Sequence, residues 1–153
     1  MNEKFIESFS NSFLSVLPQL GLSNVKVNGQ EDCSNVIESP GVIVIIGMIG
    51  DLRGNVIFAM KEDCAKKIAS TMMCGMEITE FDAMAQSAVS ELSNMLAANA
   101  CTELSCAGIK ADISTPTLIH GSFTATASFD HAVCIEMLVD DFSVNIYISM
   151  EQC

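Results

Sequence analysis

The sequence predicts one α/β domain, residues 1–153, in which two helix-plus-hairpin halves with pseudo-two-fold symmetry form one mixed β-sheet, with long helices packed on one face. Two observations lead to this fold class. Apolar residues recur at helical spacing in some segments and form β-branched or alternating runs in others. A segment that ends the first hairpin also recurs in the second. A chain of 153 residues, 50% of them hydrophobic, is typical of a single domain with its own core.

The first helix is predicted over residues 3–17. Its apolar side chains recur three and four positions apart and would form one stripe facing the core: Phe5, Ile6, Phe9, Phe13, Val16 and Leu17. Pro18 and Gly21 are expected to end this helix. The polar stretch from Gln30 to Ser34 is interpreted as part of a connection.

The first hairpin follows. Val42–Ile49 is a continuous, largely β-branched run, which is typical of a central strand. Asp51–Gly54 has the composition of a turn, and Asn55–Met60 is predicted to be the returning strand.

Two further helices are predicted. One begins at about Glu62 and ends near Gly75. The other, Thr79–Ala107, is the longest in the sequence, rich in Ala, Leu, Met and Glu, with no Pro or Gly inside. Its first residue stands three positions before Asp82, which is an imperfect capping box, and Gly108 is expected to close its other end.

The remainder predicts mainly strands. Residues 109–119 look extended, since Pro116 disfavours helix at the residue before it. Residues 121–131 are polar and could be a strand or a loop. Residues 133–139 are predicted to be a strand, Asp140 and its neighbour a turn, and residues 142–149 a half-buried strand because apolar and polar side chains alternate.

An internal repeat connects the two halves. Asp51–Met60 aligns without gaps on Asp141–Met150, sharing the turn Asp, an Asn, an apolar triplet and the final Met. Phe9–Asn11 aligns on Leu92–Asn94 in the preceding helices. Repeated units of this kind indicate a pseudo-symmetric domain.

The longest helix presents one polar pair, Glu91 and Asn94, at the edge of its apolar face. The apolar face itself is expected to comprise Ala85, Ala88, Val89, Leu92, Met95 and Leu96. The neighbours of the pair on its own face, Ser87 and Ala98, are small, so nothing bulky is expected to cover it. In the helical alignment the first half has Ser8 where the second has Glu91.

Two interpretations of the pair stay open from the residues alone. Glu91 and Asn94 could simply be a solvated helix face. Alternatively, a carboxamide can hold a water by two hydrogen bonds without titrating, and a neighbouring carboxylate can pair with a cation of a docked partner. Met84 and Met95 border this face and could form an adaptable apolar rim for such a partner, alongside Ser87 and Ala98.

Other candidates are weaker. Asn99 is expected to be a buried structural amide. Glu7 and Asn11 are four residues apart, so they are expected to be a degenerate copy rather than a second pair. The glycines do not form a phosphate-binding loop, and no nucleophile elbow is present.

The composition excludes several classes of function. The net charge is −12 and the isoelectric point about 4.2, which disfavours nucleic acid and anionic membranes as partners. No stretch resembles a membrane span or a signal peptide, so a cytoplasmic location is expected. The seven cysteines show no paired spacing and are expected to be reduced, and no metal or other cofactor of the chain itself is expected.

One set of residues resembles a known family. Ser90–Asn94 within this helix, the downstream Asn99–Ala100, Pro116–Thr117 and the turn at residues 50–54 are similar to the CheC/CheX/FliY phosphatases of bacterial chemotaxis, and most closely to CheX. The resemblance covers nearly the whole chain.

The resemblance implies a protein phosphatase that dephosphorylates a CheY-like response regulator. Asn94 would orient the attacking water and Glu91 would pair with a lysine of the regulator, which would also supply the Mg²⁺. With Ser8 in the first half, a single site is implied, as in CheX. The resemblance further implies a homodimer formed by joining sheets.

Two other functions compete with the phosphatase. The same fold could be a non-catalytic interaction module that binds a signalling or flagellar-switch partner. A small-molecule hydrolase is disfavoured because no nucleophile, metal set or convergent pocket residues are evident.

Overall fold

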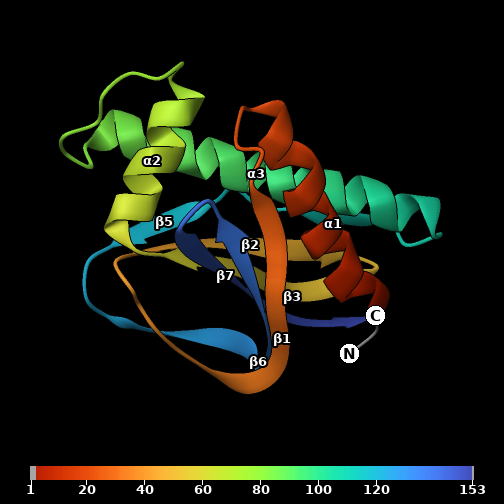
Figure 1. The fold of residues 1–153 in the computed structure, drawn as a ribbon. Helices are drawn as coiled ribbons and strands as arrows, with labels where there is room; N and C mark the ends of the chain where they lie inside the picture. Colours follow the sequence, from red (N-terminus) through yellow and green to blue (C-terminus); the bar gives the residue numbers. More distant parts are fainter. Residues whose placement is uncertain (1–2, 153) are drawn as a thin grey trace.

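Within the part of the chain that the structure describes, three helices cover one face of a single β-sheet (Figure 1). The computed structural model describes residues 3–152. The elements in chain order are α1 Glu3–Gln19, β1 Val25–Glu38, β2 Val42–Gly50, β3 Leu52–Met60, α2 Glu62–Met72, α3 Ala83–Cys106, β4 Ala111–Ile113, β5 Thr117–His120, β6 Thr124–Val139 and β7 Phe142–Gln152. The predicted α/β class with helices on one face is confirmed. In one detail the sheet differs from the prediction: every strand pairing among the described residues is antiparallel, so the sheet is not mixed.

The sheet has the predicted pseudo-two-fold symmetry. Its strand order is β1, β6, β7, β3, β2, β4, with β5 also pairing with β2. In the two halves, β1 corresponds to β4 and β5, β2 to β6, and β3 to β7. When each strand is replaced by its equivalent, the same strand order is obtained, read from the opposite edge of the sheet. Ile57 and Tyr147, which occupy the same position in the two repeats, are direct partners in the pairing of β3 with β7. The symmetry axis therefore passes through this pair at the centre of the sheet.

The helices obey the same symmetry, but in a register one residue away from the predicted one. Ser8 is buried and donates a hydrogen bond to the Phe5 carbonyl oxygen at 2.8 Å, whereas Glu91 is exposed. The structure instead matches Glu91 with Glu7, which is also exposed. The predicted alignment of the two helices was based on identical residues, whereas the pattern of buried positions supports an alignment shifted by one residue.

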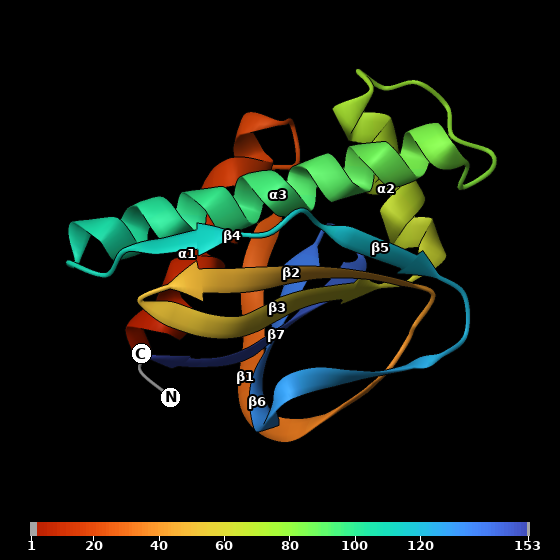
Figure 2. The same cartoon turned by 180° about the vertical axis from the view of Figure 1, so that it is seen from behind.

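The main core lies between the helices and the sheet. Its largest fully buried side chains include Phe9, Phe13, Phe58 and Leu104. A second, smaller cluster lies on the opposite face of the sheet: Ile37, Ile43, Ile57, Ala59 and Ala127. It forms because the paired β1 and β6 curl beneath that face (Figure 2).

Strand β1 corrects a prediction. The stretch from Gln30 to Ser34, interpreted from the sequence as a connection, lies inside this 14-residue strand. β1 is at the edge of the sheet and most of its side chains are exposed, so its sequence lacks the apolar alternation that marks a half-buried strand. Residues 121–131, for which strand and loop were both open, mostly belong to its partner β6.

Three observations concern the described chain as a whole. No helix within residues 3–152 is long and apolar enough to span a membrane. The six cysteines in this range are free thiols. No group of three or more His, Cys, Asp or Glu side chains in the same range is arranged to hold a metal ion.

Candidate functional site on helix α3

The start of α3 sets the orientation of the whole helix. The Asp82 carboxylate accepts a hydrogen bond from the Ala85 backbone N–H at 2.9 Å, so Asp82 is the N-cap and the helix begins at Ala83. The predicted start at Thr79 was therefore four residues too early. The Gln86 side chain donates a second hydrogen bond to the Phe81 carbonyl oxygen at 3.0 Å, and Phe81 is buried. These contacts fix the helix against the core before it reaches the polar pair.

Glu91 and Asn94 lie in the middle of α3, away from both helix ends. Glu91 is exposed and Asn94 is half-buried, as expected for residues at the edge of the apolar face. Neither side chain makes a hydrogen bond or an ion pair with any other residue in the range 3–152. A carboxylate and a carboxamide are therefore presented together with their hydrogen-bonding groups available to a partner.

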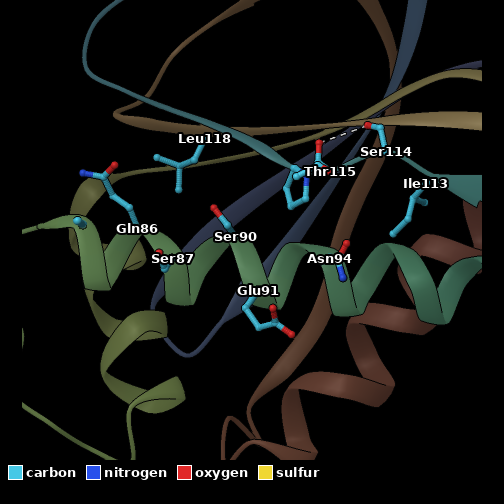
Figure 3. Close-up of a pocket in the computed structure, with 11 residues that line it drawn as sticks. Gln86, Ser87, Ser90, Glu91, Asn94, Ile113, Ser114, Thr115 and Leu118 are labelled. Atoms are coloured by element: carbon cyan, nitrogen blue, oxygen red, sulfur yellow. Dashed lines mark hydrogen bonds between the residues drawn. The ribbon is translucent and has the colours of Figure 1, made fainter.

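The pair borders a groove of about 750 Å³ between α3 and the segment that joins β4 to β5. The groove is lined by Ala83, Gln86, Ser87, Ser90, Glu91, Asn94, Ile113, Ser114, Thr115, Pro116 and Leu118. Figure 3 shows Ser90 pointing across to Thr115, whereas Glu91 points away from that segment on the outer side of the helix. Among the described residues that line the groove, Glu91 alone is charged.

The far wall of the groove is held in place by β2. The Ser114 N–H donates to the Gly47 carbonyl oxygen at 2.9 Å, and the Gly47 N–H donates to Ser114 Oγ at 2.8 Å. A Cβ atom on Gly47 would lie 3.0 Å from Ser114 Oγ, so glycine permits this close approach. The wall is consequently a fixed part of the sheet edge.

The four predicted partner-binding residues differ in their exposure and in their distance from the groove. Ser87 lines the groove, and Ala98 is exposed on the same helix outside it. Met84 is 62% exposed at the start of α3, whereas Met95 is half-buried and packs on the core. Only part of the predicted rim is therefore available for contact.

The groove also contains residues that sequence reasoning did not assign to the site. Gln86 and Ser90 could have been found, because they lie eight and four residues before Asn94 on the same helix, about two turns and one turn away. Ser114 could not have been found in this way, since its place in the groove depends on pairing with β2, which is distant in sequence.

Asn99 corrects another prediction, because it is exposed rather than buried. In the second half of α3 the buried positions are Leu96, Ala97, Ala100 and Leu104. Here α1 crosses the helix, and Ser12 Oγ donates to the Leu96 carbonyl oxygen at 2.6 Å. Because α1 packs against this half of α3, the side of the helix that is buried here differs from the side buried in the first half, and Asn99 lies outside it.

Cys64 of α2 and Cys101 of α3 are not activated thiols, and neither lines the groove. Burial raises the pKa of Cys64 to about 12 and that of Cys101, the half-buried thiol on α3, to about 11. Both thiols are therefore protonated near neutral pH, and the thiolate is the reactive form. What α3 offers is an amide that can orient a water and a carboxylate that can attract a cation.

The fold and this helix define the class of CheC-like proteins. The crystal structure of a CheC-like superfamily protein from Shewanella sp. PV-4 has a TM-score of 0.87 to this chain, with 26% identity and 99% of each chain covered. The chain belongs to the CheX family: the sequence model described as "Chemotaxis phosphatase CheX" matches residues 42–139.

Two relatives add detail. The CheY-P phosphatase CheX of Thermotoga maritima is 33% identical over 116 residues, which are 75% of this chain and 74% of that protein. The crystal structure of a CheX-CheY-BeF3-Mg²⁺ complex from Borrelia burgdorferi has a TM-score of 0.76, with 24% identity over 97% of this chain and 98% of the other. At that identity the second likeness concerns the fold alone.

Proposed function

We propose that this chain is a protein phosphatase that hydrolyses the phosphoaspartate of a CheY-like response regulator. One observation carries the proposal: a CheX-family chain presents Glu91 and Asn94 side by side on α3, with no intramolecular partner among residues 3–152. The name of the Thermotoga maritima relative, a CheY-P phosphatase, supports the same activity.

In the proposed mechanism the Asn94 amide enters the phosphoaspartate pocket of the regulator and orients a water in line with the scissile bond. The water oxygen bonds to phosphorus while the bond from phosphorus to the aspartyl oxygen breaks. The aspartate leaves as a carboxylate with the bonding electron pair, and both water protons remain on the released phosphate. Positioning the nucleophile and balancing charge are the main requirements of phosphoryl transfer.

The regulator would supply the remaining groups. We propose that its bound Mg²⁺ neutralises the phosphoryl oxygens, so this chain needs no cofactor of its own. The Borrelia burgdorferi complex, which contains CheY, BeF3 and Mg²⁺, is consistent with this arrangement. Glu91 would pair with a lysine of the regulator beside the phosphorylated aspartate.

We expect catalytic amounts of this chain to shorten the lifetime of a phosphorylated CheY-like regulator. The measurement is the release of phosphate from a radiolabelled regulator, with and without about one molecule of this chain per 100 molecules of regulator. At this ratio, a faster release from the whole regulator pool requires repeated turnover. Stoichiometric binding with an unchanged lifetime would instead support a non-catalytic interaction module and contradict the proposed function.

Replacing Glu91 by alanine should lower kcat/KM about 10- to 100-fold, chiefly by raising KM, because a regulator lysine loses its partner at the interface. Glu77→Ala is the matched control, since Glu77 is an exposed carboxylate that makes no side-chain hydrogen bond or ion pair within residues 3–152, and its replacement removes the same charge. Equal losses in both variants would indicate a general effect of net charge and contradict a specific ion pair.

We also propose the homodimer that the family resemblance implies. β1 lies at the edge of the sheet, and an unpaired strand edge is a surface through which two sheets can join.

A further inference from the structure

One sequence feature has no part in the proposed function. Asn28 is followed by Gly29, and this is the single Asn-Gly pair of the chain. In such a pair the backbone nitrogen of the glycine can attack the side-chain amide carbon of the asparagine, because no Cβ atom obstructs its approach. Both residues are exposed in strand β1, and a Cβ atom built on Gly29 would meet no described residue other than its chain neighbours within 4 Å. The space that this reaction needs is therefore open.

A β-bulge removes Asn28 from the ladder between β1 and β6. Val27 lies opposite Met137 and Gly29 lies opposite Glu136, so Asn28 is an extra residue with no counterpart on β6. The ladder is disrupted at a bulge, and the extra residue is left unpaired. The backbone around Asn28 is consequently less constrained than that of a paired residue when the Gly29 nitrogen approaches the side chain.

The Asn28 side chain joins the bulge to β6 through Glu136. Asn28 Nδ2 donates a hydrogen bond to Glu136 Oε1, and Ser143 Oγ donates to Glu136 Oε2 at 3.1 Å. Glu136 is half-buried, and these two neutral donors satisfy one lone pair on each of its oxygens. The asparagine amide thus stabilises a carboxylate at the edge of the sheet.

We infer that Asn28 is a site of spontaneous deamidation, and that its conversion loosens the first part of β1 from β6. The Gly29 nitrogen bonds to Asn28 Cγ while the bond from Cγ to Nδ2 breaks. Ammonia leaves with the proton lost from the Gly29 nitrogen, and a five-membered succinimide remains. Water then opens this ring, adding OH to one of the two carbonyl carbons and H to the nitrogen, which gives aspartate or isoaspartate. The inference is independent of the phosphatase activity.

Either product reverses the contact with Glu136. Aspartate has no N–H to donate and places a second negative charge beside the Glu136 carboxylate, and like charges on neighbouring strands are destabilising. Isoaspartate in addition inserts one carbon atom into the backbone of β1, which shifts the register of the ladder. Among the described residues β1 pairs with no strand other than β6, so a second strand does not compensate for the loss.

The first experiment measures the modification itself. The whole protein is incubated at alkaline pH, and peptide mass spectrometry follows the conversion of each asparagine. Asn28 should deamidate at least about tenfold faster than Asn35, which lies in the same strand but precedes valine. Gly29→Ala, whose new methyl group obstructs the attacking nitrogen, should slow the conversion of Asn28 by about the same factor. Equal rates at Asn28 and Asn35 would overturn the inference.

The second experiment measures the consequence for β1. Asn28→Asp reproduces one product, and it should raise the hydrogen-exchange rate of the amides in residues 25–31 at least about fivefold. Adding Glu136→Gln should reverse most of this increase, since the new amide removes the like charge and can donate to Asp. Asn99→Asp is the matched control, because Asn99 is exposed on α3 and makes no side-chain hydrogen bond within residues 3–152. Unchanged exchange in Asn28→Asp, the same increase in Asn99→Asp, or no reversal by Glu136→Gln would overturn the assigned consequence.

Discussion

Replacing Asn94 by alanine should slow catalysed dephosphorylation of the regulator about 100-fold or more and leave the fold intact. The methyl group of alanine cannot hold a water by hydrogen bonds, and loss of a positioned reacting group costs roughly this factor. The Asn94 side chain is only half-buried and makes no hydrogen bond within residues 3–152, so its truncation removes no internal hydrogen bond. Single-turnover decay of a phosphorylated regulator measures the effect, and thermal unfolding measures the stability.

Asn99→Ala provides the control for this variant. Asn99 is exposed on the same helix and outside the groove, so the same substitution there should leave the rate unchanged. Full activity in Asn94→Ala, or an equal loss in Asn99→Ala, would contradict a role for the Asn94 amide in orienting water.

Those parts of the fold whose signal is local were predictable from the sequence. The two hairpins carry β-branched or alternating residues and turn signals within about 20 residues, and the repeat made their equivalence visible. β1 was not predictable, because an edge strand exposed on most positions carries no apolar pattern. Its pairing with β6 joins residues about 100 positions apart, which no local rule detects.

The candidate site divides in the same way. The exposure of Glu91 and the partial exposure of Asn94 followed from helical periodicity, which is a local property. The groove wall at Ser114 and the exposure of Asn99 depend on β2 and α1, which contact the site only after folding. The alignment of α1 with α3 was predicted one residue out of register. Asn11 and Asn94 are identical residues and suggested one alignment, but the buried positions of the two helices support another.

Gly54 gives the largest expected loss of stability. The sequence placed Gly54 in a turn, but it lies within β3, directly opposite Met150 of β7 and three residues before Ile57. Its φ of +133° is strained for any residue with a side chain. A Cβ atom there would lie 2.1 Å from the Ser149 carbonyl oxygen and 2.8 Å from the Met150 Cα.

Gly54→Ala should therefore lower the free energy of unfolding by about 3 kcal/mol or more, since backbone strain and overpacking each cost about 1 to 3 kcal/mol. For a domain of this size the Tm should fall by about 6 to 12 °C. Gly29→Ala is the control, because Gly29 lies in β1, has no positive φ, and would place a new Cβ atom more than 4 Å from any other side chain or distant backbone atom. An unchanged Tm in Gly54→Ala would contradict this prediction, because it would mean that β3 and β7 can shift apart to admit the methyl group without loss of stability, despite their nine-residue pairing.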